Sequence, residues 1–308
     1  MTNTGDVLAA DIGGTNLRLA RVQADGHIVQ EVRVQTHFSQ LSGLSGEEAA
    51  QVIADTISQA TKPLLDNNIA GLGIGFPGFF IGNSGILASS PNIPQLENFN
   101  LAEQLSKQLN LPVSAQNDAL CAAVGEQTFG AGKGTNNLLH ITLGTGIGGG
   151  LILNNQPYTG ESGMAMEFGH LRVVHGDDAR FCGCGNRGCV EAYASATAIS
   201  ARYAEISGET LETKVIFDRA THGDNDAKTI IKSAGTYLGQ AIAEAIKLLD
   251  IHTVTISGGM IGAWDIWHPN IKTALDNNLI PPLKGRIQVL PSALGDNAGL
   301  LGAAKLLV

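Results

Sequence analysis

Hydrophobic and polar positions at the start of the chain predict three strands followed by a helix. An apolar run at Val7–Ala10 is followed by alternation at 17–22, and an Asp-Gly pair then precedes a third apolar stretch near 28–34. Ser45 and Glu48 have the spacing of a capping box, and the apolar residues after them recur with a helical period. We therefore expect a three-strand meander and an amphipathic helix.

The pattern continues and then starts again. A buried strand at 69–78 enters a Gly-Pro turn, and a helix at 101–109, a strand at 113–116 and a helix at 119–129 follow. From Leu138 the sequence LLHITLGTGIGGGLIL repeats the order strand, glycine turn, strand that is found in VLAADIGGTNLRLA. This repetition predicts an internal duplication of an α/β unit.

Later segments complete the second copy. A long helix is predicted at 227–249, and a strand with its own glycine turn at 253–262. We expect an N-terminal α/β domain at 1–115 and a C-terminal α/β domain at 116–296, with a final helix at 297–308 that returns to the first domain.

Composition limits the class of protein. The 308 residues are 44% hydrophobic and 15% charged, which is a globular composition. The net charge of −9, without a cluster of Lys or Arg, argues against nucleic acid as a partner. The first residues do not resemble a signal peptide, and no apolar run approaches the about 20 residues that a membrane helix needs. We therefore expect a cytoplasmic enzyme that binds neither nucleic acid nor membranes.

Two glycine-rich turns between strands indicate phosphate binding. DIGGTN at 11–16 places a carboxylate, two glycines and a hydroxyl between two strands, and GTGIGGG at 144–150 repeats the arrangement. Glycine lets successive backbone N–H groups converge on an anion, and Asp11 is suited to hold the Mg²⁺ of a bound polyphosphate. Each turn alone is equally typical of a tight hairpin. Together, and with SGGM at 257–260, they predict two lobes facing one polyphosphate.

Two other nucleotide motifs fit less well. Gly144, Gly146 and Gly149 satisfy G-x-G-x-x-G, but that fingerprint requires a helix after the glycines, and here a strand is predicted. The residues from Gly130 to Lys133 lack the first glycine and the final Ser or Thr of a Walker A loop. These departures argue against a Rossmann oxidoreductase and a P-loop enzyme.

Three of the four cysteines are concentrated in RFCGCGNRGC, as Cys182, Cys184 and Cys189, whereas Cys121 is alone. A disulfide is unfavourable in a cytoplasmic chain, and a redox pair favours Cys-x-x-Cys over Cys-x-Cys. Three thiolates in a short loop suit zinc, which takes four ligands. The spacing favours a metal site over chance, but it is looser than that of a zinc finger.

Several short motifs form a specific set. DIGGT at the start, NDA at 117–119, LGTGIGGG at 143–150, EFGH at 167–170 and CGCGNRGCVE at 182–191 occur in this order, and GDNAGLLGAA at 295–304 extends the set. They resemble the ROK family (repressors, open reading frames and sugar kinases), which belongs to the actin/hexokinase/Hsp70-like ATPases. The resemblance spans nearly the whole chain. It implies a two-lobed, ribonuclease H-like α/β fold of duplicated domains, with ATP and sugar in the cleft between the lobes.

The resemblance also implies roles for individual residues. Asp118 matches the catalytic base, and His170 would be the fourth ligand of a structural zinc, beside Cys182, Cys184 and Cys189. The implied sugar-binding residues are Gly78, Asn117, Asp118, Glu167, His170 and Glu191, with Asn92 as a weaker candidate. The implied residues for ATP and Mg²⁺ are Asp11, Gly13, Gly14, Thr15, Asn16, Gly144, Thr145, Gly146, Gly148, Gly258 and Gly259.

Structural explanations compete with some of these roles. An Asp between a strand and a helix, such as Asp118, is by spacing alone more typical of a helix N-cap than of a base. The resemblance favours the base, because phosphoryl transfer to an alcohol needs an acceptor for the hydroxyl proton. Met166 precedes Glu167 at a position where sugar kinases of the family often have glycine, so the sugar stays open.

The expected function is an ATP- and Mg²⁺-dependent hexose kinase, with glucose as the first candidate for the sugar. N-acetylhexosamine kinase and fructokinase are the alternatives within the class. A sugar-responsive repressor of the same family carries an N-terminal helix-turn-helix of several dozen residues, and DIGGT begins at residue 11, which argues against it. The resemblance further suggests a homodimer.

Overall fold

The structure is a computed structural model that describes residues 5–13, 15–91 and 93–307. It divides into two compact units: Met1–Asn136 with Gly150–Ala165 and Asp296–Val308, and Asn137–Gly149 with Met166–Gly295. This division differs from the boundary expected near residue 115, because 116–136 and 150–165 count with the first unit.

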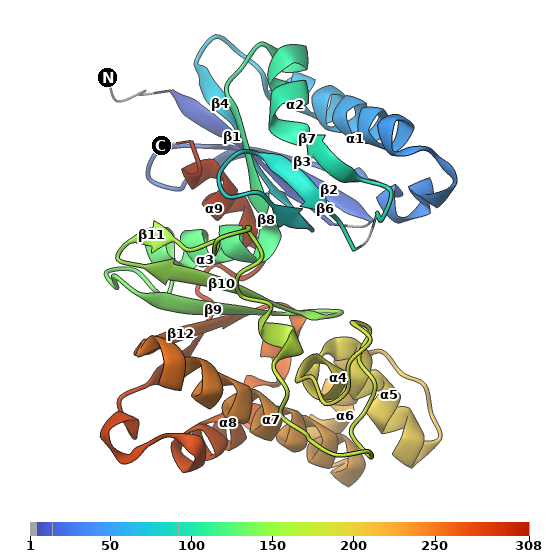
Figure 1. The fold of residues 1–308 in the computed structure, drawn as a ribbon, viewed down its shortest axis with the longest axis vertical. Coiled ribbons are helices and arrows are strands. Elements are labelled where there is room, and N and C mark those ends of the chain that lie inside the picture. Colours follow the sequence, from blue (N-terminus) through green and yellow to red (C-terminus); the bar gives the residue numbers. More distant parts are fainter. Residues whose placement is uncertain (1–4, 14, 92, 308) are drawn as a thin grey trace. The chain divides into compact units, whose positions relative to one another are not determined.

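A five-stranded sheet in the order β3-β2-β1-β4-β8 forms the centre of the first unit (Figure 1). Its strands are β1 (Asp6–Ile12), β2 (Asn16–Val22), β3 (Ile28–Gln35), β4 (Ile69–Phe76) and β8 (Val113–Asn117). The first three pair antiparallel and confirm the predicted meander, whereas β4 and β8 extend the sheet in parallel with β1. The carboxyl ends of β1, β4 and β8 therefore lie at one edge of the sheet.

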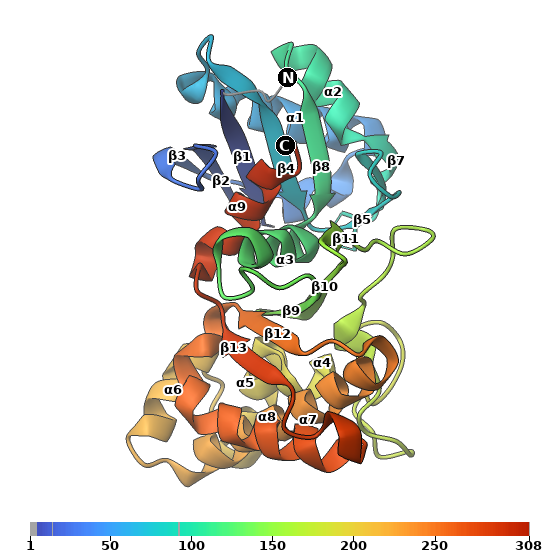
Figure 2. The ribbon, with the colours of Figure 1, turned by 90° about the vertical axis from the view of Figure 1, so that its left-hand side faces the viewer.

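Helices pack on this sheet. They are α1 (Gly46–Thr61), α2 (Leu101–Leu109), α3 (Asp118–Phe129) and α9 (Ala298–Lys305), with the short turns η1 (Phe38–Gly43) and η2 (Lys62–Leu64). Figure 2 shows α9 in front of β1 and β4, and both strands contact it. The capping box of α1 is confirmed, since the Ser45 hydroxyl accepts a hydrogen bond from the Glu48 N–H and the Glu48 carboxylate accepts one from the Ser45 N–H.

Glycines bring the last helix close to α3 and β4. A Cβ on Gly302 of α9 would lie 1.7 Å from the backbone oxygen of Cys121, and a Cβ on Gly73 would lie 1.8 Å from that of Ala303. Any side chain at these two positions would force the elements apart, because interiors are close-packed. Helix α9 thus holds α3, with Asp118 at its start, against the sheet.

A small sheet follows Pro77 and Gly78, which come directly after β4. It pairs β5 (Phe79–Phe80), β6 (Ile86–Ser89) and β7 (Glu97–Asn100), all antiparallel. The side chains of Phe80 and Leu87 are fully buried and belong to the same core as Leu8 of β1 and Ile53 of α1. This packing fixes the loop that contains Gly78.

A second five-stranded sheet repeats the plan of the first, in the order β11-β10-β9-β12-β13. Its strands are β9 (Leu138–Leu143), β10 (Ile147–Leu153), β11 (Gln156–Pro157), β12 (Thr253–Ser257) and β13 (Gln288–Pro291), and the division into units falls within β10. As in the first sheet, a hairpin partner comes first and parallel strands follow, with β12 pairing in parallel with both β9 and β13. The two strand orders correspond one to one, which confirms the predicted duplication.

The second unit carries most of the helices that follow β9. They are α4 (Glu191–Ala194), α5 (Ala196–Ser207), α6 (Thr213–Thr221), α7 (Asn225–Leu249) and α8 (Trp264–Asn278), with η3 (Phe168–His170), η4 (Gly259–Ala263) and η5 (Pro281–Leu283) as short turns. The division into units falls within a further short turn, η6 (Gly295–Asn297). Helices α7 and α8 pack closely, since a Cβ on Gly239 would lie 2.4 Å from the backbone oxygen of Ile271. Within the described ranges, no helix combines the length and apolar character needed to cross a membrane.

Candidate functional site

Two aspartates lie at the carboxyl edge of the first sheet. Asp11 is near the end of β1 and pairs with Gly75 of β4, and Asp118 comes directly after β8. A Cβ on Gly75 would lie 3.7 Å from the Cα of Asp118, so Gly75 is a neighbour of both acidic residues. The parallel arrangement of β1, β4 and β8 therefore gathers residues that are far apart in the sequence.

Burial changes the proton affinity of both carboxyl groups. Burial is the main cause that raises the pKa of Asp11 to about 6. The negative charges of Asp118 and Asp296 raise this pKa further, whereas the positive charge of Arg18 lowers it. Burial also raises the pKa of Asp118, against the lowering effect of the Ala119 N–H, which donates to Oδ1 at 2.9 Å. Two half-buried carboxylates near each other favour a cation or a proton, because either relieves the cost of their charge.

Helix α3 is capped by Asn117 and not by Asp118. The Asn117 side-chain oxygen accepts a hydrogen bond from the Leu120 N–H at 3.1 Å, and its amide group donates to the backbone oxygen of Gly78 at 3.0 Å. Asn117 thus takes the capping role that spacing alone assigned to Asp118, and it also ties the Gly78 loop to the start of α3. The Asp118 carboxylate is consequently not needed as the helix cap.

We expect Asp11→Asn to stabilise the protein at pH 8 when Mg²⁺ and nucleotide are absent. A carboxyl group with a raised pKa in the folded state holds its proton more tightly when the protein is folded. Ionisation of Asp11 therefore lowers the free energy of unfolding as the pH rises from its ordinary pKa of 3.8 through its folded-state pKa of about 6. An amide avoids this loss, which should amount to roughly 1–3 kcal/mol at pH 8 and fade by pH 4.

Urea unfolding of wild type and Asp11→Asn at the two pH values measures this difference. Asp55→Asn, a change of an exposed aspartate on α1, is the control. Equal stability of wild type and Asp11→Asn at pH 8 would show that the Asp11 charge carries no cost in the fold.

The first glycine turn is an exposed hairpin. The Gly13 N–H donates to the backbone oxygen of Asn16 at 2.8 Å, and the side-chain amide of Asn16 donates to the Thr15 hydroxyl at 3.1 Å. Thr15 and Asn16 are exposed beside Asp11, which is the placement that a phosphate-binding turn requires. Gly14 and Asn92, also predicted to bind ligands, lie outside the described residues.

The second glycine turn leads into a strand, as predicted, and not into the helix of a dinucleotide fingerprint. The Gly144 N–H donates to the Gly146 oxygen at 3.0 Å, and Gly148 already belongs to β10. Gly258 has a φ of +98°, and a Cβ on it would lie 2.1 Å from the Leu143 oxygen. This close approach places the end of β12, followed by Gly259 of η4, beside the turn.

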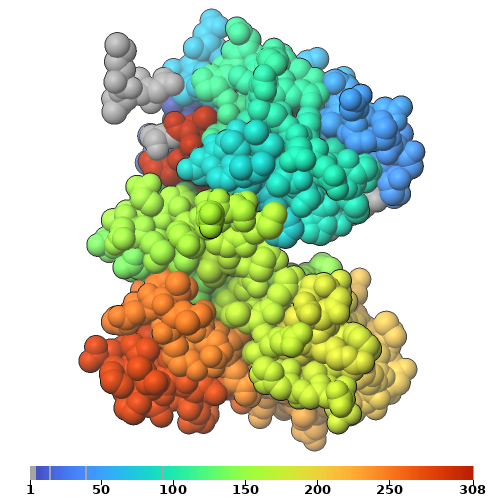
Figure 3. Space-filling model, viewed as in Figure 1, coloured from blue at the N-terminus to red at the C-terminus, as the bar shows by residue number. Residues whose placement is uncertain are grey.

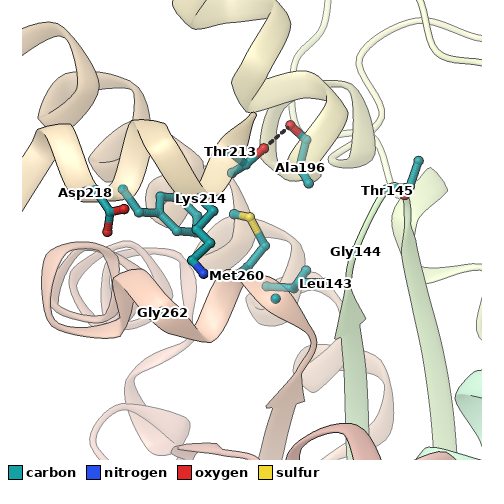
Figure 4. A pocket seen from close by; sticks show the side chains of 11 residues that line it. Leu143, Gly144, Thr145, Ala196, Thr213, Lys214, Asp218, Met260 and Gly262 are labelled. Atoms are coloured by element: carbon teal, nitrogen blue, oxygen red, sulfur yellow. Dashed lines mark hydrogen bonds between the residues drawn. The ribbon is translucent and has the colours of Figure 1, made fainter. Parts of the chain in front are cut away.

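A pocket of about 380 Å³ adjoins this turn within the second unit. Gly144 and Thr145 line one side, and Lys214 of α6 and Met260 of η4 line others; Figure 4 shows the Lys214 side chain extending toward Met260. The volume is typical of a small-molecule site. The sequence motifs did not predict any contribution from α6, because its residues carry no local signature.

Three cysteines and a histidine form a cluster with the dimensions of a zinc site. Tetrahedral zinc, with Zn–S of about 2.3 Å and Zn–N of about 2.0 Å, separates two sulfurs by about 3.8 Å and a sulfur from a nitrogen by about 3.5 Å. The Sγ atoms of Cys184 and Cys189 are 3.7 Å apart, and Cys182 Sγ lies 3.6 Å from Nδ1 of His170. All four ligand atoms lie within 4.8 Å of one another, so the donor set and its geometry fit zinc.

The surroundings of the cluster orient its ligands. Nε2 of His170 lies 3.5 Å from a carboxylate oxygen of Glu167. This carboxylate favours the tautomer that carries its proton on Nε2, which leaves the Nδ1 lone pair free to bind a metal beside the cysteines. The Asn186 backbone N–H is the main cause that lowers the pKa of Cys184 to about 7, which helps to form the thiolate that a metal needs. The segment 175–188 is at the surface of its unit (Figure 3), where residue Phe181 is 71% exposed.

Glu191 connects this cluster with the second glycine turn. Its Oε2 accepts a hydrogen bond from the Ile147 N–H at 2.9 Å, and its Oε1 lies 3.7 Å from Cys182 Sγ. The sequence predicted Glu191 only as a sugar ligand. The contact with Ile147 had no local signal, because the two residues are brought together by the packing of η3, α4 and β10.

Met166 adopts a backbone conformation that favours glycine. Its φ is +72°, in the left-handed region that non-glycine residues rarely occupy. The position where the resemblance implies that glycine is frequent is therefore one where the chain adopts this conformation. The adjacent Glu167 carboxylate is exposed, which is compatible with a ligand role.

Comparison with solved structures defines the class of the fold. A ROK family glucokinase from Streptomyces griseus, solved in complex with glucose and AMPPNP, superposes with a TM-score of 0.80 at 30% identity and covers 98% of this chain and 99% of that one. The paired sheets with their glycine turns are those of the actin-like ATPase fold. The ROK family model matches residues 7–308, and the chain belongs to the ROK family.

Two relatives illustrate the activities found at this level of similarity. The glucokinase of Thermotoga maritima is 33% identical over 98% of this chain and 96% of its own. The N-acetyl-D-glucosamine kinase of Haemophilus influenzae is 30% identical over 96% of this chain and 97% of its own.

Proposed function

We propose that this protein is an ATP-dependent hexose kinase that transfers the γ-phosphoryl group of MgATP to a hydroxyl of glucose. The observation that carries the proposal is the Asp118 carboxylate, which stands at the start of α3 without serving as its cap and has a raised pKa. The 33% identity to a glucokinase along almost the whole chain supports glucose as the acceptor.

Asp118 would accept the proton of the attacking sugar hydroxyl. Phosphoryl transfer is mostly positioning and electrostatic stabilisation, and the remaining requirement is an acceptor with suitable proton affinity. Burial raises the pKa of this carboxyl group and so makes the carboxylate a stronger base. Asp11, at the same edge of the sheet, would hold the Mg²⁺ of ATP directly or through water.

The two glycine turns would bind the phosphates of ATP, and the pocket beside the second turn would take the nucleoside. Gly13, Thr15 and Asn16 present one turn, and Gly144 to Gly148 the other. Because the pocket adjoins Gly144 and Thr145, a nucleoside there would lead its phosphates directly to the turn. Gly258 and Gly259 would complete the contact from η4.

The sugar-binding candidates are those that the family resemblance implies. The candidates are Gly78, Asn117, Glu167, His170 and Glu191. Carboxylates accept hydrogen bonds from hydroxyl groups in defined directions, and none of these groups obviously recognises an acetamido substituent. Of the alternatives, N-acetylhexosamine kinase has a specific support, the 30% identity to the Haemophilus influenzae enzyme.

Zinc held by His170, Cys182, Cys184 and Cys189 would be structural, because four protein ligands leave no open position. It would set the orientation of His170 and of the loop that ends at Glu191. We also propose that the protein is cytoplasmic. We propose further that it acts as a homodimer, and sedimentation of the purified protein would test this oligomeric state.

We expect glucose to give the highest kcat/KM among common hexoses, with mannose accepted. A coupled ADP-release assay across glucose, mannose, fructose, N-acetylglucosamine and N-acetylmannosamine measures this order. An N-acetylated sugar whose kcat/KM exceeds that of glucose by more than about tenfold, which corresponds to about 1.4 kcal/mol in transition-state binding, would replace glucose as the proposed substrate. The kinase chemistry would remain in place.

A further inference from the structure

One side chain of the second unit contacts two functional segments. The Glu191 carboxylate accepts the Ile147 N–H at 2.9 Å through Oε2, and its Oε1 lies 3.7 Å from Cys182 Sγ. Ile147 directly follows the glycine turn assigned to the ATP phosphates, whereas Cys182 belongs to the loop assigned to the sugar side. Glu191 is thus shared between the two binding regions.

The residues around this contact pack closely. A Cβ on Gly146 would lie 2.6 Å from Oε2 of Glu191. A Cβ on Gly169, next to His170, would lie 3.3 Å from the same oxygen and 2.4 Å from the backbone oxygen of Ile147. The start of β10 therefore packs against both Glu191 and the turn that carries His170.

The glycine turn has a second anchor on the same side. The Ala196 N–H at the start of α5 donates to the Gly144 oxygen at 2.9 Å, and the Thr197 hydroxyl donates to the Thr145 oxygen at 2.9 Å. Helix α5 follows α4, which begins at Glu191. Glu191 and the start of α5 together hold both ends of the turn, so displacement of Glu191 acts on the turn at its exit into β10.

We propose that Glu191 couples sugar binding to nucleotide binding through its hydrogen bond with the Ile147 backbone. This inference rests on the proposed kinase function and deepens it. A sugar hydroxyl that donates to the carboxylate restricts the Glu191 side chain, and the bond to Ile147 then restricts the glycine turn. An ordered turn loses less conformational entropy when it binds phosphate, so each ligand strengthens the other.

Two substitutions separate this bond from the charge of Glu191. Glu191→Gln removes the negative charge but keeps an acceptor oxygen for the Ile147 N–H, and its amide group can donate to the sugar hydroxyl, which then accepts. Glu191→Asp keeps the charge, but the side chain is one methylene shorter and its oxygens no longer reach the Ile147 N–H. If the bond carries the coupling, Gln should preserve it and Asp should lose it, which is the reverse of the order that a charge effect would give.

The measurement is calorimetric titration with a non-hydrolysable ATP analogue and Mg²⁺, with and without saturating glucose. We expect glucose to tighten nucleotide binding at least about fivefold in the wild type and in Glu191→Gln, and to have almost no effect in Glu191→Asp. Zinc content should stay at about one per chain in all three, which shows that the loop is intact. Glu244→Ala, a change of an exposed acid that pairs with Lys247 on α7, is the control and should behave as wild type.

Gly146→Ala provides a second approach that leaves Glu191 itself unchanged. Its methyl group would displace Oε2 from the turn, so saturating glucose should no longer tighten nucleotide binding. A wild-type protein that phosphorylates glucose but binds the analogue equally well with and without it overturns the coupling and leaves the kinase function standing. Coupling that survives in Glu191→Asp and disappears in Glu191→Gln overturns the role of the Ile147 bond. A protein that phosphorylates none of the tested sugars overturns both proposals.

Discussion

Asp118→Asn is expected to lower kcat for glucose phosphorylation by roughly 10²–10⁴-fold, because the substitution removes the acceptor of the hydroxyl proton. The fold should persist, since Asn117 and not Asp118 caps α3, and Asn is close to Asp in size. The KM values for sugar and ATP should change much less than kcat. Steady-state kinetics with both substrates varied measures the three quantities.

The matched control for this variant is Asp55→Asn, which removes an exposed carboxylate of the same unit and should keep wild-type kcat. Zinc content and the unfolding midpoint of Asp118→Asn should equal those of the wild type. Turnover within a few-fold of wild type would eliminate Asp118 as the base. Asp11 would then be the next carboxylate to test, because it lies at the same edge of the sheet.

Cys184→Ser is expected to reduce the zinc content well below one per chain and to weaken glucose binding by at least about tenfold. A serine hydroxyl is a poor zinc ligand at neutral pH, so the zinc site would lose one of its four ligands. His170 and Glu191 would then be less well oriented, and the entropy of ordering them would fall on sugar binding. Affinity for the nucleotide alone should change little, whereas its enhancement by glucose should disappear together with the order of Glu191.

Metal analysis and separate titrations of glucose and nucleotide test this expectation. Cys121→Ala removes the cysteine outside the cluster, which is fully buried in the first unit, and should retain the metal. A wild-type protein that contains no zinc and has full kinase activity would mean that the cysteines have no structural role. A Cys184→Ser variant that loses nucleotide and sugar affinity equally would mean that the loop supports the whole unit and not the sugar side in particular.

Local patterns in the sequence were sufficient to predict the elements and several candidate groups. The meander, the capping box at Ser45 and the two glycine hairpins depend on interactions between residues close in the chain, and all are present in the structure. The repeated order of strand, glycine turn and strand predicted the duplication for the same reason. The three cysteines could be recognised as a candidate metal site because a short loop confines their sulfurs, although the resemblance to the family was needed to add His170.

Tertiary structure alone decided how these groups are connected. The gathering of Asp11 and Asp118 requires β1, β4 and β8 to be parallel, and the position of α3 depends on glycine contacts with a helix from the other end of the chain. The choice of Asn117 as cap, the contribution of Lys214 to the pocket and the bond between Glu191 and Ile147 also have no local signal. Such contacts depend on which surfaces pack together, and a one-dimensional pattern records the character of each surface but not its partner. The sequence therefore determined which chemistry is present, and the fold decided which groups act on each other.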